Sequence, residues 1–390
     1  MHLRLLSWAM ILTLGTCLTA GARGQAALEL PPDPYLKGDR ALSEAAGFVD
    51  TGRFAWGDGH GTLDIEELLG KVPLRWVETA HFKIGSTLPQ YSLEKDERSR
   101  VKEELTRLAQ RIPRVKARTK TLDPWLRLYL YAQRLEDLYA ELAALLGHGD
   151  TLQDGLLPGM EGKLCVLLLE KKSSLGRYAK RYGTSDGNAP VRLNFPRVGS
   201  LCFVSCTEFF DGEMDKDAPF YCQLVWGVCQ NILAGYEGYT FSLPRWLADG
   251  MSYWCQRRID PEYPSFSQMS GSKAAAMADT EWPRKVRARV KVDVYPTAAT
   301  MIEWQHTDKL PLADHTMMFS RVDYLLSRED DSFARFMKAV KQPIDAGLLV
   351  PGHELVRDRV TESLASVYGF TLDDFDQAWA EWVLKTYPRR

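Results

Sequence analysis

The residue types at helical spacing between Asp217 and Asp260 determine what chemistry this stretch could do. Trp226 and Gln230 are four positions apart, Gly227 follows Trp226, and Asp249 comes about twenty residues after Gln230. Positions i and i+4 share one face of an α-helix, so two histidines there can bind one zinc ion. A glutamate beside the first histidine can then deprotonate a zinc-bound water. The chain has a carboxylate at the last position and neither imidazole nor base at the others.

Two helices joined by a short loop are expected to position these residues. The first has Asp217 as a predicted N-cap and Pro219 in its first turn, and it ends at Gly235. The second opens at Ser242, again a capping residue, followed closely by Pro244. Apolar residues recur at helical spacing along both segments, which predicts two buried helices packed together.

The stretch Leu243–Gly250, LPRWLADG, resembles the second active-site helix of the gluzincin metallopeptidases, the zinc-peptidase clan that includes thermolysin-like and peptidase-MA-like proteins. In that family the first helix carries H-E-x-x-H, and a glutamate on the second helix is the third zinc ligand. The resemblance aligns Asp249 with that glutamate and VWGVCQN with the ligand helix. Trp226 then stands at the first histidine, Gly227 at the glutamate and Gln230 at the second histidine.

These four relic positions (Trp226, Gly227, Gln230 and Asp249) predict that zinc and catalysis have been lost. Trp226 has no lone pair for a metal, and Gln230 has only a neutral amide oxygen, a poor match for zinc. Gly227 cannot act as a base. We expect no catalytic residue, metal or cofactor here, and we expect the bulk of Trp226 to fill the space of the metal and its water.

Three other motifs could carry chemistry. The first is a relocated metal or acid–base cluster of Asp249 with residues of the helical C-terminal part, which the spacing does not require. Its members would be His306, Asp314, His315 and His353. The second is Gly-x-Ser-x-Gly around Ser185, which follows a helix where a nucleophile elbow needs a strand, so a plain loop is preferred.

The third motif, Trp56–Leu68, resembles an EF-hand calcium loop in its second half. Trp56 occupies the position of the first ligand, which argues against calcium. The preferred interpretation is a Gly-rich turn followed by a helix that starts at Asp64.

The N-terminus has the pattern of a secretory signal peptide. Met1–Arg4 is positively charged, Leu5–Thr19 is a short apolar run, and small residues follow, so cleavage is expected after Ala22 or Ala26. The alternative is an uncleaved membrane anchor, for which the run is short. We therefore expect an exported, periplasmic or extracellular protein without a later membrane span.

Charge and cysteine content limit the partners and the redox chemistry. The net charge is −2 with both signs interspersed, which argues against nucleic acid, and the basic run Arg284–Lys291 is interpreted as a solvated face. Six cysteines remain after Cys17, an even number that permits up to three disulfides outside the cytoplasm. Their apolar surroundings favour buried free thiols for most, and at least one bridge remains open as an alternative.

The order of elements predicts an α+β protein, with a zincin-like sheet lobe packed on a mainly helical C-terminal lobe. The expected parts are a signal peptide (1–26), an N-terminal extension (27–73), the sheet lobe with the helix pair (74–260) and the helical lobe (261–390). Strands are predicted at Leu74–Thr87, Lys163–Lys171, Pro190–Phe195 and Ser200–Thr207. In Leu74–Thr87, ETAHFKI resembles the opening strand of peptidase-MA-like domains, with His81 half-buried in it. If Leu201–Thr207 is the sheet edge, it could pair with a peptide backbone.

The resemblance implies an exported, non-catalytic metallopeptidase-like protein that binds a polypeptide or cell-envelope component in the relic cleft. One alternative is an active hydrolase with a relocated metal or acid–base site. The other is a structural protein of the cell envelope.

Overall fold

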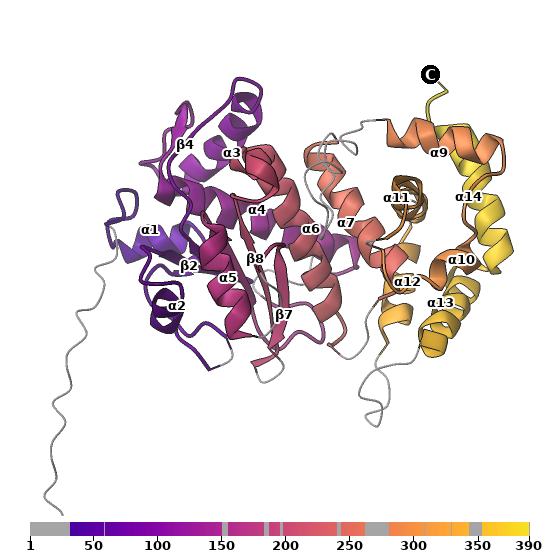
Figure 1. Cartoon of the computed structure of the whole chain (residues 1–390), viewed down its shortest axis with the longest axis horizontal. Helices are drawn as coiled ribbons and strands as arrows, with labels where there is room; N and C mark the ends of the chain where they lie inside the picture. Colours follow the sequence, from indigo (N-terminus) through magenta and orange to yellow (C-terminus); the bar gives the residue numbers. More distant parts are fainter. Residues whose placement is uncertain are drawn as a thin grey trace, which may run out of the picture.

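The protein belongs to the α+β class: a six-stranded mixed sheet comes first and a group of helices follows (Figure 1). The computed structural model describes residues 32–57, 59–149, 155–182, 187–195, 198–239, 243–261, 281–307, 309–328, 330–342 and 353–389. The predicted signal peptide, the motif serine Ser185 and the predicted cap Ser242 lie outside these ranges.

The sheet has the strand order β1-β2-β3-β6-β8-β7. Its strands are β1 (Phe48–Asp50), β2 (Arg75–Thr79), β3 (Phe82–Ser86), β6 (Leu164–Leu169), β7 (Val191–Phe195) and β8 (Ser200–Cys206). β3, β6 and β8 run parallel, whereas β2 and β7 are antiparallel to their neighbours. A separate two-stranded sheet joins β4 (Tyr91–Ser92) to β5 (Thr121–Leu122).

One strand prediction was wrong, and the condition stated for Leu201–Thr207 is not met. Leu74–Thr87 forms the hairpin β2–β3, because the Thr79 hydroxyl bonds both the backbone N–H and the carbonyl of Phe82 and closes a turn. His81 lies in that turn and is buried, with Nδ1 2.5 Å from the Glu136 carboxylate. The segment Leu201–Thr207 is not at the sheet edge, because β8 lies between β6 and β7, and the two edge strands are β7 and β1.

Helices cover both faces of the sheet. α4 (Pro124–Leu145) packs on β2 and β3, and α6 (Asp217–Gly235) packs on β8. α5 (Lys172–Arg181) lies on the opposite face, where Tyr178 contacts the Cys202 thiol at 3.5 Å. Side chains alternate along a strand, so Phe203 and Ser205 of β8 point towards α6.

The predicted N-terminal extension contributes to this sheet. It contains α1 (Arg40–Ala45), the edge strand β1 paired with β2, and α2 (Thr62–Leu68). α2 begins at Thr62, two residues before the predicted start, because the Asp64 carboxylate accepts from the Gly61 N–H at 2.7 Å and caps the helix. α3 (Arg98–Arg111) follows the second sheet's first strand.

The remaining helices form the C-terminal part of the molecule. They are α9 (Trp282–Lys291), α10 (Ala298–Ile302), α11 (Leu312–Leu326), α12 (Ser332–Lys341), α13 (His353–Tyr368) and α14 (Leu372–Thr386). Figure 1 shows α6 and α7 (Arg245–Ile259) between the sheet and this group. Within the described residues, no helix has the length and apolar character needed to cross a membrane.

All six described cysteines are buried free thiols. The sulfurs of Cys229 on α6 and Cys255 on α7 are 3.9 Å apart, the nearest approach to a bridge between the two helices. Burial raises the pKa of the Cys165, Cys202 and Cys222 thiols, which keeps them protonated at neutral pH.

Buried charges fix the N-terminus of α6. Asp217 is the first residue of the helix rather than its N-cap, and Glu97 accepts from the N–H groups of Asp217 and Ala218. Both Asp217 carboxylate oxygens pair with Arg134, at 2.9 and 2.8 Å, and Arg100 adds a third contact at 3.1 Å. Burial raises the pKa of Asp217, but the positive charges of these arginines lower it by more. The pKa of Asp217 is therefore held well below its usual range.

A buried lysine holds the other end of the helix. Lys341 on α12 donates to the carbonyl oxygens of Ala234 and Gly238, at 3.0 and 2.9 Å. Burial lowers the pKa of Lys341 to about 7, and Glu237 acts in the opposite direction. The C-terminus of α6 is therefore joined to the helical part of the molecule.

We expect Asp217→Asn to lower the free energy of unfolding by about 3–5 kcal/mol, because it leaves Arg134 and Arg100 with less compensation in a buried site. The control is Asp137→Asn, whose pair with Arg107 is half exposed (53% and 44%) and should cost no more than about 1 kcal/mol. Urea unfolding at pH 7 measures both. Since the pKa of Asp217 is lowered by folding, the difference should shrink as the pH falls below about 4. Equal losses in the two variants would contradict this assignment.

The lowered pKa of Lys341 makes stability depend on pH in the alkaline range. Between pH 7 and about 10.5 the unfolded chain keeps a proton on this lysine that the folded chain has released, so stability should rise with pH. We expect the wild type to gain roughly 2 kcal/mol relative to Lys341→Met between pH 7 and pH 9. Parallel urea titrations of both proteins measure this, and parallel pH profiles would show that Lys341 stays charged when folded.

Candidate functional site

Gln230 and Asp249, two of the four predicted relic positions, meet in the structure. Gln230 on α6 donates from Nε2 to Oδ1 of Asp249 on α7 at 2.6 Å, and both side chains are buried. Earlier in α6, the Cys222 thiol donates to the Gln256 carbonyl, which lies later in α7 than Asp249. The two helices therefore run antiparallel. The sequence places Gln230 and Asp249 19 residues apart, and helix packing brings them into direct contact.

Trp226 lies one helical turn before Gln230 and is also buried, with 5% of its surface exposed. Its indole lies near the hydroxyl of Tyr253 on α7, which in turn contacts Nδ1 of His315 on α11 at 2.9 Å. The indole thus lies on the α7 side of α6.

Gly227 is required by packing. A Cβ at this position would lie 2.1 Å from Cε2 of Phe203 on β8, so no side chain fits without moving the phenyl ring. The missing Cβ lets α6 approach the sheet closely. A general base at this position is therefore excluded by geometry as well as by residue type.

Arg192, which was not predicted as a site residue, also contacts these side chains. Arg192 on β7 donates from Nε to Asn231 Oδ1 at 2.8 Å, from Nη2 to the Gln230 carbonyl at 3.2 Å, and from Nη1 to Gln230 Oε1. Thr307, before α11, donates to the second Asp249 oxygen at 2.5 Å. A chain of hydrogen bonds therefore runs from the sheet edge through both helices to the helical part of the molecule.

No local signal marked these two residues. In VRLNF the alternation of Arg192 and Asn194 with apolar residues is typical of a solvated strand face, and Thr307 lies in an irregular segment. Only the antiparallel pairing of Arg192 with Phe203 turns the guanidinium towards α6.

The electrostatics of the site are those of a cation and a carboxyl group separated by an amide. Burial raises the pKa of Asp249, while Thr307, Arg245, Arg192 and Gln230 act in the opposite direction. Burial lowers the pKa of Arg192 to about 10, Arg245 lowers it further, and Asp249 opposes both. Arg192 remains positively charged at neutral pH.

The donor set does not fit zinc. Trp226 and Gln230 offer an indole and a carboxamide in place of imidazole ligands, and Asp249 already accepts two hydrogen bonds. Across the described ranges, no group of three or more histidine, cysteine or acidic residues is arranged to hold a metal. We therefore assign no metal-assisted step to the relic positions.

The residues of the predicted relocated site have separate surroundings. His315 is buried against Tyr253, and burial lowers its pKa to about 4, so its imidazole is neutral at pH 7. His306 is exposed, and burial raises the pKa of the half-buried Asp314. His353 is the first residue of α13, and its side chain lies outside the described atoms.

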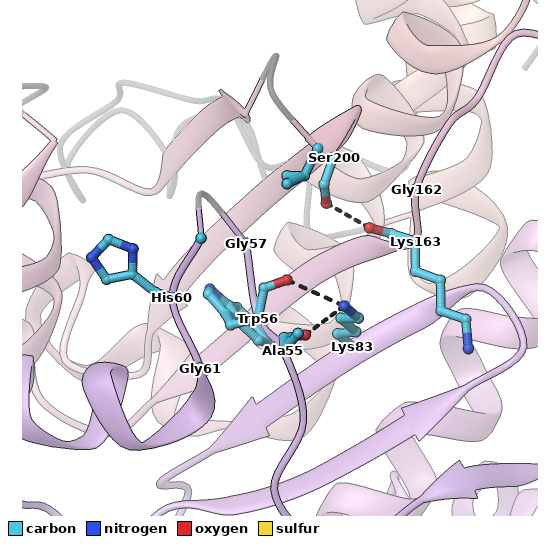
Figure 2. A pocket seen from close by; sticks show the side chains of 11 residues that line it. Ala55, Trp56, Gly57, His60, Gly61, Lys83, Gly162, Lys163 and Ser200 are labelled. Carbon is cyan, nitrogen blue, oxygen red and sulfur yellow. Dashed lines mark hydrogen bonds between the residues drawn. The ribbon is translucent and has the colours of Figure 1, made fainter.

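The Gly-rich loop before α2 borders a pocket of about 280 Å³. Figure 2 shows the Lys83 ammonium donating to the carbonyl oxygens of Ala55 and Trp56, and the Ser200 hydroxyl donating to the Lys163 carbonyl. Asp64 serves as a helix cap. The loop therefore follows the turn-and-helix interpretation.

A second pocket, of about 260 Å³, lies between the edge strand β7 and α6, beside the relic positions. It is lined by Arg192, Leu193, Asn194, Leu201, Asn231, Ala234 and Tyr239. β8 is the only strand paired with β7 in the described sheet, so alternate backbone N–H and C=O groups of β7 face away from it.

Comparison with known proteins returns no match: no family model, no curated protein and no solved structure is similar to this chain.

We expect the double variant Trp226→His/Gln230→His to bind one zinc ion per chain, because two imidazoles at i and i+4 would face Asp249. Equilibrium dialysis with elemental analysis measures the stoichiometry. Adding Asp249→Asn should weaken binding at least about 10-fold. Peptide hydrolysis should stay absent because Gly227 is unchanged. If the double variant binds no more zinc than the wild type, the alignment of these positions with a ligand set is wrong.

Proposed function

We propose that this chain is an exported, non-catalytic protein with a metallopeptidase-like frame, and that it binds an extended polypeptide along β7. The contact between Gln230 and Asp249 is the observation that carries the proposal, because hydrogen bonds take the place of the metal that this helix geometry would hold. The zincin-like arrangement of a sheet lobe on a helical lobe and the gluzincin relationship are parts of the same proposal.

The position of the pocket supports the binding role. A polypeptide added to β7 would satisfy the outward backbone groups of that strand and place alternate side chains over Asn231 and Ala234 of α6. The close approach of α6 to β8 at Gly227 and the hydrogen bond from Arg192 to Asn231 support a pocket wall that is organised before a ligand binds. Cell-envelope polypeptides are the expected partners, following the predicted signal peptide.

We expect a random peptide library to bind the full chain and to emerge intact. Hydrogen–deuterium exchange should show new protection in β7, because strand addition occupies its outward amides, and little change in the central strand β6. Ala234→Phe should fill the pocket and reduce binding at least about 10-fold, whereas Ala299→Phe on the exposed face of α10 should not.

Two results would redirect the proposal. Cleaved peptides, detected by mass spectrometry, would favour a hydrolase with a relocated site. No binding and no protection, together with sedimentation in an envelope fraction, would favour the structural role.

A further inference from the structure

The pocket beside β7 contains a cation without a carboxylate partner among the described residues. Arg192 gives its three hydrogen bonds to neutral acceptors, the side-chain amides of Gln230 and Asn231 and one backbone carbonyl. Among the other buried arginines, Arg127 likewise donates to a backbone carbonyl, that of Pro89, whereas two have carboxylate partners. Arg134 contacts two carboxylates and Arg321 contacts Asp376 at 2.6 Å.

Such a charge is costly in the unbound protein. A guanidinium carries five N–H donors, and three of those of Arg192 bond described protein atoms. Burial lowers its pKa, and the nearby Arg245 adds to this effect, so the surroundings disfavour the charge that the group nevertheless keeps. Asp249 does not compensate it directly, because Gln230 and Thr307 occupy its two oxygens.

Asn231, which is hydrogen-bonded to Arg192, provides a second donor. Asn231 is buried, and its Oδ1 accepts from Arg192, which leaves its NH2 group as a donor. Both residues line the pocket. Tyr239, on the same wall, is already bonded to the Gly199 carbonyl and the Glu161 N–H. The groups left for a ligand are thus a guanidinium and an amide N–H, a pair that suits an anion with two oxygens.

We infer that the pocket binds a carboxylate of the polypeptide ligand, through Arg192 and Asn231. The inference rests on the proposed peptide-binding function and specifies its ligand class. The carboxylate is either the C-terminus of a peptide that ends in the pocket or the side chain of an Asp or Glu within it. In both cases the ligand supplies a carboxylate in direct contact with Arg192, which no described residue does.

Four synthetic nonapeptide libraries separate these sources: with or without a free C-terminal carboxylate, and with or without Asp and Glu. We expect the library without any carboxylate to bind the full chain about 10–100-fold more weakly than its charged counterparts, as for loss of a charge-assisted hydrogen-bond pair. Weakening on amidation alone identifies the C-terminus, and weakening on removal of Asp and Glu alone identifies a side chain.

Asn231→Asp tests most directly whether Arg192 requires a carboxylate from the ligand. It adds an internal carboxylate to Arg192 in an almost isosteric side chain, so the preference for charged libraries should disappear while the melting temperature stays the same or rises. The exposed Asn188→Asp adds the same charge outside the pocket and should keep the preference. Arg192→Lys should retain part of it and Arg192→Met none.

The outcomes separate this inference from the proposed function. If all four libraries bind equally and protect β7, the polypeptide role stands and the carboxylate inference is overturned. If no library binds or protects β7, both are overturned.

Discussion

The hydrogen bond between Gln230 and Asp249 is the contact on which the centre of this molecule depends. Both groups are buried, and a buried polar group without a partner costs roughly 1–3 kcal/mol or more. Each group therefore needs the other, and each is held by one further residue, Arg192 for the amide and Thr307 for the carboxylate. The α6–α7 pair keeps its spacing because these four side chains satisfy one another.

The ends of α6 are fixed by charge rather than by local capping. At the N-terminus Glu97 accepts from the first backbone N–H groups and Asp217 pairs with Arg134 on α4. At the C-terminus Lys341 donates to two of the carbonyl oxygens. Each contact comes from another element, so α6 is positioned by the sheet side and by the helical part together. Gly227 then allows the close approach to Phe203 that this position requires.

A guanidinium and two side-chain amides connect the sheet edge to α6 and Asp249 by hydrogen bonds. Each of these bonds has a defined partner among the described residues. These hydrogen bonds fix the position of α6 relative to β7. The pocket beside β7 lies directly next to them.

The sequence alone determined what depends on residue type and local period. It located the helix pair from prolines and apolar spacing, and the strands β6, β7 and β8 from short apolar or alternating runs. The identities of Trp226, Gly227 and Gln230 by themselves show that these positions carry neither an imidazole nor a base. It missed the turn inside Leu74–Thr87, because the Thr79 hydroxyl bonds that close it leave no mark in hydrophobic alternation.

Only the tertiary structure decided which strand is the edge and which side chains complete the site. Arg192 reaches Gln230 across 38 residues, and Thr307 reaches Asp249 across 58. Strand order and such pairings arise from packing between elements, whereas spacing in a sequence carries information about one helix or strand at a time.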